Sequence, residues 1–131
     1  GNDGAPECAT CHGGAHEVQK TSTEAFKKAV PENCGMCHTE AAEQFATSEH
    51  GKAVAAGVVG APVCTDCHGE HAILARTQPN SPVNKAQIRE TCARCHGDLR
   101  LASRFGLPAD RITSFDTSFH GRLLGLAGSR R

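Results

Sequence analysis

Aromatic residues and long apolar segments are scarce in this sequence. Its 131 residues include no tryptophan, no tyrosine, one methionine and five phenylalanines. The longest apolar stretch, residues 53–63, is interrupted by Gly57, Gly60 and Pro62 and is far too short to span a bilayer. The length predicts a single domain, and a core built from these side chains alone would be thin.

An excess of charge of either sign is also absent. The chain carries 14 basic and 14 acidic residues, with no basic stripe and no aromatic residues interleaved with basic ones. Nucleic-acid binding is therefore not expected. No signal peptide is present, and residues 1–3 (Gly-Asn-Asp) read as the start of a mature or trimmed chain.

All eight cysteines lie in four copies of one short motif, Cys-x-x-Cys-His. This spacing is the attachment signature of c-type haem, in which two thiols form thioethers and the histidine becomes the proximal iron ligand. Positions i, i+3 and i+4 of a helix share a face, so one turn can hold both the ring edge and the iron. The predicted attachment residues are Cys8, Cys11, Cys34, Cys37, Cys64, Cys67, Cys92 and Cys95, and the predicted proximal ligands are His12, His38, His68 and His96.

Other uses of paired cysteines explain this pattern less well. Four Cys-x-x-Cys pairs could bind two structural zinc ions or form a disulfide scaffold. Neither use requires a histidine directly after every pair. A thioredoxin-like redox site explains one such pair, not four.

Four histidines remain after the proximal ligands are assigned: His16, His50, His71 and His120. Four six-coordinate haems need eight axial ligands, and the chain has eight histidines. Met36 lies inside the second motif and faces the wrong way to serve its own iron. We therefore expect bis-histidine ligation throughout. His16 and His71 follow a proximal histidine too closely to serve the same haem, so they must reach neighbouring irons and the haems must be close together.

The chain contains an internal repeat. Phe45–Lys52 and Phe115–Arg122 share the pattern Phe-x-x-Ser-x-His-Gly followed by a basic residue. Each copy follows a pair of haem motifs. The repeat predicts a single tetrahaem domain, residues 1–131, made of two dihaem units at about 8–57 and 64–127 with a short linker between them.

Short helices and little or no β-sheet are expected, because haems would occupy the space in which layers of secondary structure pack. The predicted fold class is mainly irregular, with short α-helices wrapped around a four-haem stack. The predicted helices are Thr23–Val30, opened by a Thr21-x-x-Glu24 capping box and ended by Pro31, one from Thr39 toward His50, one opened by an Asn84-x-x-Gln87 capping box, one over Asp98–Phe105, and one capped by Ser114 or Thr113 and running through His120.

From Cys8 to Gly121 the sequence resembles the multihaem c-type cytochromes. The resemblance rests on Cys-x-x-Cys-His and on Phe-x-x-Ser-x-His-Gly followed by Cys-x-x-Cys-His-Gly-x-His. It implies closely spaced bis-histidine haems and electron transfer. Tetrahaem members of the family include periplasmic shuttles, and similar small chains polymerise into extracellular filaments. In longer relatives a further haem motif follows the histidine-glycine string, as Cys64 follows His50, whereas none follows His120 here.

These features predict an electron carrier rather than an enzyme, because saturated histidine ligation leaves no open iron site. The expected cofactor is four covalently bound haem c groups. The expected partners are redox proteins, extracellular electron acceptors or further copies of the chain in a head-to-tail homopolymer, with no membrane span. A soluble periplasmic shuttle and a multihaem oxyanion reductase remain alternatives. Haem attachment normally takes place outside the cytoplasmic membrane, so the expected location is periplasmic or extracellular.

Overall fold

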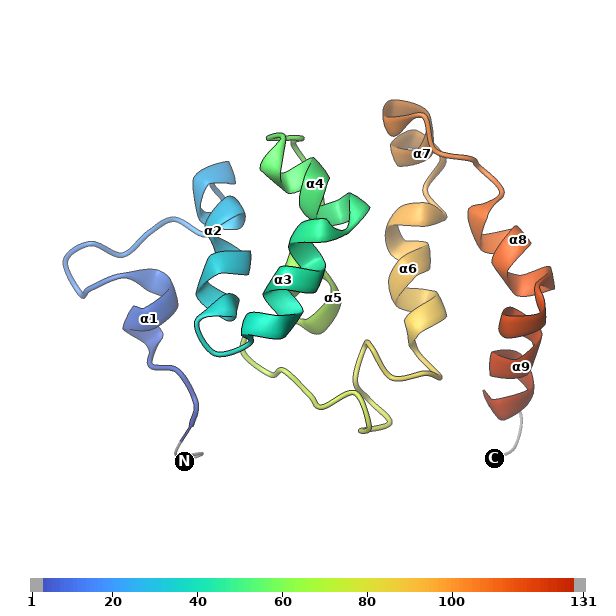
Figure 1. The fold of residues 1–131 in the computed structure, drawn as a ribbon, viewed down its shortest axis with the longest axis horizontal. Helices are drawn as coiled ribbons and strands as arrows, with labels where there is room; N and C mark the ends of the chain where they lie inside the picture. Colours follow the sequence, from blue (N-terminus) through green and yellow to red (C-terminus); the bar gives the residue numbers. More distant parts are fainter. Residues whose placement is uncertain (1–3, 129–131) are drawn as a thin grey trace. The chain divides into compact units, whose positions relative to one another are not determined.

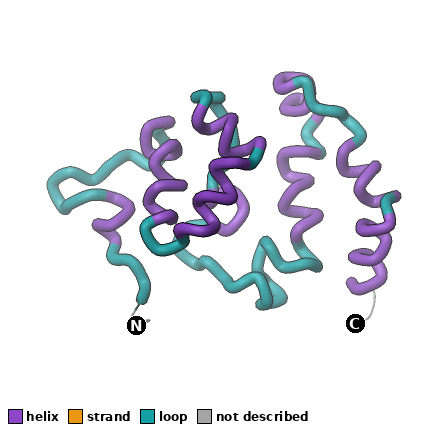
Figure 2. Tube along the Cα trace, viewed as in Figure 1, coloured by secondary structure: helices purple, strands orange, loops and turns teal. Residues whose placement is uncertain are grey.

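The chain is helical and irregular, and no β-strand occurs among the residues that the structure describes, 4–128. The computed structural model has nine helices in this range (Figures 1 and 2). The prediction of short helices without a sheet is confirmed. In chain order the helices are α1 (Cys8–His12), α2 (Glu24–Gly35), α3 (Thr39–Thr47), α4 (Glu49–Ala55), α5 (Cys64–His68), α6 (Ile88–His96), α7 (Leu99–Phe105), α8 (Arg111–Thr117) and α9 (Phe119–Gly128).

Two compact units divide the chain, Gly1–Asp66 and Cys67–Arg131. The division falls inside α5, a few residues beyond the linker expected at residues 57–62. In the first unit, α1 and α3 contact α2, and α4 contacts α3. In the second unit, α7 and α8 contact α6, and α9 contacts α8. The two dihaem repeats themselves stay a prediction.

Helix α2 continues through Pro31, where we predicted that it would end. The N-cap is Thr23, whose hydroxyl accepts a hydrogen bond from the Phe26 amide at 3.1 Å, and not Thr21, which the predicted capping box would place there. A proline inside a helix removes one backbone hydrogen bond and is costly in isolation. Here α2 packs closely on α3, since a Cβ placed on Gly35 would lie 2.9 Å from the Cβ of Ala42. This tertiary packing keeps the last turn of α2 helical.

A serine interrupts the helix before each of two spare histidines. We predicted continuous helices reaching His50 and His120, and this is wrong. Ser48 separates α3 from α4 with an extended backbone (ψ 162°), and Ser118 separates α8 from α9 in the same conformation (ψ 163°). Each histidine is therefore the second residue of a new helix.

The serine hydroxyl stabilises the break by bonding to the backbone on both sides. Ser48 Oγ donates to the Phe45 carbonyl oxygen at 2.6 Å and accepts from the Gly51 amide at 3.1 Å. Ser118 makes the same two bonds in the second unit, also at 2.6 Å and 3.1 Å. The hydroxyl thus ends one helix and caps the next.

The glycine that follows each of these histidines is required by a close backbone approach. A Cβ on Gly51 would overlap with the carbonyl oxygen of Phe45, and a Cβ on Gly121 would overlap with that of Phe115. The repeated Ser and Gly are therefore explained by one local structure, a helix–serine–helix joint that carries a histidine and to which each phenylalanine contributes its backbone carbonyl oxygen.

The helix that enters the fourth motif begins at Ile88, and its start differs from the predicted capping box. Gln87 is the N-cap residue but makes no side-chain cap hydrogen bond. The Asn84 side chain instead accepts from the Ala86 amide at 3.0 Å and donates to the Arg76 carbonyl oxygen at 2.9 Å. It stabilises the turn before α6.

Helix α7 ends at Phe105 as predicted, whereas Asp98, which we expected inside the helix, is its N-cap. The Asp98 carboxylate accepts from the amides of the first turn, and Gly106 ends the helix in the left-handed conformation (φ 63°). The next helix, α8, starts earlier than expected, at Arg111, so neither Thr113 nor Ser114 is its N-cap.

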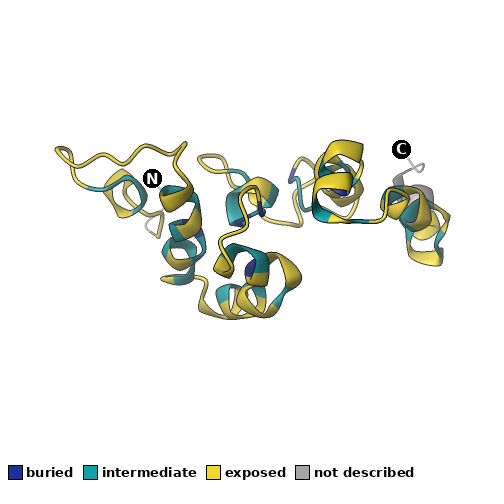
Figure 3. Ribbon diagram, turned by 90° about the horizontal axis from the view of Figure 1, so that it is seen from above, coloured by how far each residue is buried: buried dark blue, intermediate teal, exposed yellow. Residues whose placement is uncertain are grey.

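The protein core is small, as the composition predicts. Among the described residues, the buried apolar side chains are Val30, Ala61 and Val63 in the first unit and Ala102 in the second (Figure 3). The chain exposes 9907 Å² of surface, whereas two separate compact globules of half its mass would expose about 8,000 Å² together. The surplus is surface that a large apolar group could cover.

Candidate functional site

Each of the four motifs forms its own helical turn. The first and third motifs are α1 and α5, and the fourth forms the end of α6. The second begins in α2 and continues past its end, because the His38 amide donates to the Cys34 carbonyl oxygen at 2.9 Å. In every motif the two thiols and the histidine therefore share one face of a turn.

A phenylalanine supports the histidine of the first motif. The rings of His12 and Phe26 are stacked with their centroids 5.7 Å apart and an angle of 17° between their planes. Phe26 lies on α2, so this contact links α1 to the helix that carries the next motif. The role of Phe26 could not be predicted from the repeat, because the equivalent position before the fourth motif is Asn84.

The third motif is stabilised by its own aspartate. Asp66 lies between the two cysteines, and its carboxylate accepts a hydrogen bond from the Val63 amide at 2.7 Å. The same carboxylate lies 3.4 Å from the ammonium group of Lys27 on α2. One side chain thus caps the motif's turn and connects it to a helix far away in the sequence.

The four spare histidines occupy two kinds of position. His16 and His71 lie in loops just after a motif, and His50 and His120 each follow a serine break. All four are exposed. Within residues 4–128, no three histidine, cysteine, aspartate or glutamate side chains come together as ligands for a bare metal ion, which is the arrangement that a zinc ribbon would need.

The loops that carry His16 and His71 begin in the same way. The glycine directly after the proximal histidine has a positive φ in both, 84° at Gly13 and 80° at Gly69. This conformation favours glycine and turns the chain away from the helical turn of the motif. The two loops are therefore related in backbone geometry as well as in sequence.

Comparison with known proteins agrees with these motifs. The family described as "Doubled CXXCH motif" matches residues 52–101, which include the third and fourth motifs. Multiheme cytochrome MtrA of Shewanella baltica (strain OS185) is 32% identical over 95 residues, 71% of this chain. The chain spans about a quarter of the length of that protein (25%). No solved structure matches the chain.

These findings support a multihaem c-type cytochrome. The motifs indicate covalently bound haem c. No helix in the described part of this chain is long and apolar enough to cross a membrane.

The residues of the four motifs fit haem c on chemical grounds. Each of the eight cysteines is exposed or half-buried. Each pair has its own histidine on the same turn. Large apolar side chains are left at the surface, including Met36 at 59% and Leu99 at 68% exposure. Thioether attachment needs free thiols in pairs, and a porphyrin face needs apolar neighbours.

An ion pair fixes the helix before His120 in the second unit. Arg89 on α6 donates two hydrogen bonds to the Asp116 carboxylate on α8, at 2.7 Å from Nε and 2.6 Å from Nη2. The hydrogen bonds from Arg89 hold the pKa of Asp116 below its usual value. The helix of the fourth motif is thereby connected to the helix–serine–helix joint that carries His120.

Proposed function

We propose that this cytochrome transfers electrons through four covalently attached haem c groups and carries out no bond chemistry of its own. The observation that carries the proposal is the set of four separate turns, each of which places two cysteines and a histidine on one face. Haem c supplies a reversible one-electron couple when it is bound. The match to a multihaem cytochrome supports electron transfer as the general function.

The histidines of the chain saturate the ligand positions that four haems offer. His12, His38, His68 and His96 are the proximal ligands, and His16, His50, His71 and His120 are the distal ligands. Complete ligation leaves no iron position for a substrate, which supports a carrier over an oxyanion reductase. Histidine at both axial positions also favours a low reduction potential.

The distal histidines are assigned to neighbouring motifs. His16 serves the motif of His38, and His71 serves the motif of His96, because neither can serve the motif that it follows. His50 serves the third motif. In support of this, Val54 lies one turn after His50 on α4 and lines the same cavity as Val63, which directly precedes Cys64.

His120 occupies the position in the second unit that His50 occupies in the first. His50 serves the motif that follows it in the sequence. If His120 does the same, it serves the first motif of another copy, which makes the chain a subunit of a head-to-tail, extracellular filament. A heterologous contact of this kind extends without limit unless a rotation closes it into a ring. The partners are then identical subunits and the redox proteins or extracellular acceptors at the filament's ends, and a periplasmic shuttle is the alternative.

The test is the state of the protein purified with its cofactor. Intact mass should show four haem additions, and the ferric spectrum should lack a high-spin band and should not change on adding nitrite or cyanide. Fewer than four haems, or a water-ligated iron, would contradict the proposal. A spectral shift with nitrite would favour the reductase, and a stable monomer at all concentrations would favour the shuttle.

A further inference from the structure

The helix that carries the first motif has little support of its own. Helix α1 has only five residues, and none of these five, all within the described range, is buried. A helix of this length is not stable alone. Its N-cap residue, Glu7, makes no side-chain cap hydrogen bond. The position of the first motif therefore depends on the contact of α1 with α2.

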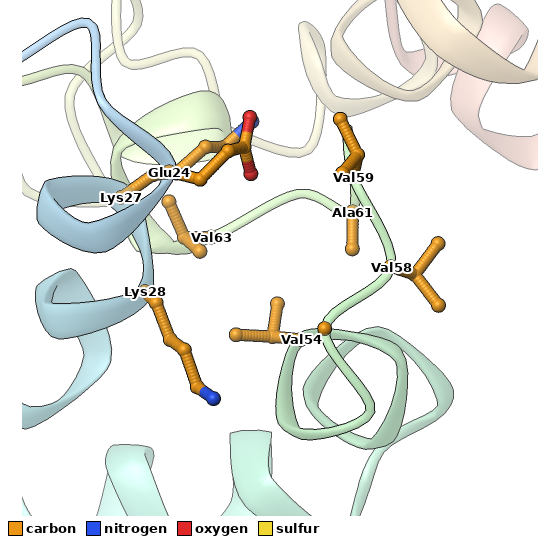
Figure 4. A pocket seen from close by; sticks show the side chains of 9 residues that line it. Glu24, Lys27, Lys28, Val54, Val58, Val59, Ala61 and Val63 are labelled. Carbon is orange, nitrogen blue, oxygen red and sulfur yellow. The ribbon is translucent and has the colours of Figure 1, made fainter.

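Helix α2, in contrast, is held on two sides. Towards its C-terminal end it packs closely on α3. Elsewhere Lys27 pairs with Asp66, and residues 57–63 lie beside the helix (Figure 4). Val63 in this segment is 2% exposed. Phe26, which directly precedes Lys27 on α2, therefore has a fixed backbone position.

The ring of Phe26 lies against the imidazole ring of His12. The two rings are nearly parallel, with 17° between their planes and 5.7 Å between their centroids, which is an offset stack. Both residues are half-buried. Because α2 is fixed and α1 is weakly supported, the phenylalanine determines the direction of the histidine ring rather than the reverse.

The direction of that ring matters to a haem. An imidazole that binds iron through one nitrogen can still rotate about the iron–nitrogen bond. The plane in which it stops sets the energies of the iron d orbitals that overlap with it, and hence the magnetic properties of the ferric haem. Groups packed around a ligating histidine fix this orientation and tune the metal.

We propose that Phe26 is a positioning residue that fixes the plane of the His12 imidazole and thereby tunes the first haem. The inference rests on the proposed function, in which His12 is the proximal ligand of that haem. The apolar ring also limits the approach of water to the ligand. Since reduction removes one positive charge from the iron, exclusion of water disfavours the oxidised form and raises the reduction potential.

The repeat restricts this tuning to one haem of an equivalent pair. The residue that corresponds to Phe26 in the second unit is Asn84, whose side chain bonds to the backbone of its own loop instead. His68, the counterpart of His12, is exposed, whereas His12 is half-buried. The first and third haems would therefore differ in potential and in magnetic signature, although their motifs have equivalent places in the repeat.

Two substitutions in the full-length, haem-loaded protein separate orientation by the ring from packing. Phe26→Leu keeps an apolar side chain but removes the ring, whereas Phe26→Tyr keeps the ring. Paramagnetic NMR of the ferric protein reports the ligand plane through the methyl groups of the first haem, assigned from the neighbouring protons of Cys8 and Cys11. An NMR redox titration of the same samples gives the potential of that haem. Phe105→Leu, the same change at another half-buried phenylalanine, is the control.

We expect Phe26→Leu to shift the methyl resonances of the first haem and to lower its potential, while Phe26→Tyr and Phe105→Leu leave both at the wild-type values. Wild-type resonances and potential in Phe26→Leu, with or without a lower melting temperature, would show that Phe26 only packs. That result overturns the inference and leaves the electron-transfer function intact, as does an equal shift at all four haems. A wild type without haem at Cys8 and Cys11 would contradict the proposed function as well.

Discussion

Lys27 and Asp66 form an ion pair, with 3.4 Å between the ammonium nitrogen and the carboxylate oxygen, and they connect α2 to the third haem motif. Both side chains are partly exposed, so the pair alone contributes little stability. The Asp66 carboxylate has a second role, because it also accepts from the Val63 amide. The two roles can be separated by mutation.

Asp66→Ala should destabilise the protein more than Lys27→Ala. The alanine variant of Asp66 loses both the cap and the ion pair, and loss of a cap costs about 1 kcal/mol. Lys27→Ala loses only the exposed pair, with an expected cost below about 1 kcal/mol. Thermal unfolding of the haem-loaded variants measures both. Asp66→Asn, which keeps an acceptor without the charge, should resemble Lys27→Ala; equal losses for all three variants would contradict the separate roles.

Gly51→Ala and Gly121→Ala should each cost about 2 kcal/mol or more, because a Cβ would overlap with a carbonyl oxygen of the preceding helix. The strained joint would also displace the neighbouring histidine. Both variants should therefore show a high-spin fraction in the ferric spectrum. Gly14→Ala is the matched control, since a Cβ there has no neighbour within 4 Å. Unchanged stability and spin state in both variants would show that the joint tolerates a side chain.

His71→Ala should convert the haem attached to Cys92 and Cys95 to high spin and leave the others low-spin. The expectation follows from the assignment of His71 to the neighbouring motif of its own repeat. Magnetic circular dichroism counts the high-spin haems, and a high-resolution structure of the variant identifies the affected one. Glu70→Gln controls for the contact of 3.9 Å between Glu70 and His71. Conversion of any other haem would refute the pairing.

Asp116→Asn should lower the melting temperature slightly at pH 7, with a difference from the wild type that disappears in acid. The pKa of Asp116 is lowered in the folded protein by its hydrogen bonds with Arg89. A lowered pKa stabilises the fold above the unfolded value of about 4, and the stabilisation is lost as the pH falls through the folded value. Melting curves between pH 3 and pH 7 test this, with Glu43→Gln as the control. A difference that grows in acid would contradict the sign.

Local chemistry in this chain could be predicted from the sequence, and contacts between distant segments could not. The motif spacing predicted the shared face of each cysteine pair and its histidine. The end of α7 at Phe105 was also correct, because the next residue, Gly106, can adopt the left-handed conformation that ends a helix. The stacking of Phe26 on His12 and the pairing of Lys27 with Asp66 join separate helices, and nothing in the local sequence indicates them.

Two errors in the helix predictions have physical causes. Pro31 was expected to end α2, but the close approach at Gly35 and Ala42 keeps the following turn helical. Ser48 was expected inside a helix, since serine is tolerated there. Its extended backbone becomes clear only from the pair of hydrogen bonds to Phe45 and Gly51. The repeat could have indicated this joint, because Phe, Ser and Gly occur at the same positions in both copies.

The scarcity of buried side chains has a consequence for how this protein can evolve. Where few positions pack against protein, the constraints on the sequence come mainly from the residues that hold the haems, so lineages can diverge quickly between the motifs. Selection is then concentrated on the cysteines, the histidines and the serine and glycine of the two joints. We expect orthologues to keep these positions long after the remaining residues have drifted beyond detection.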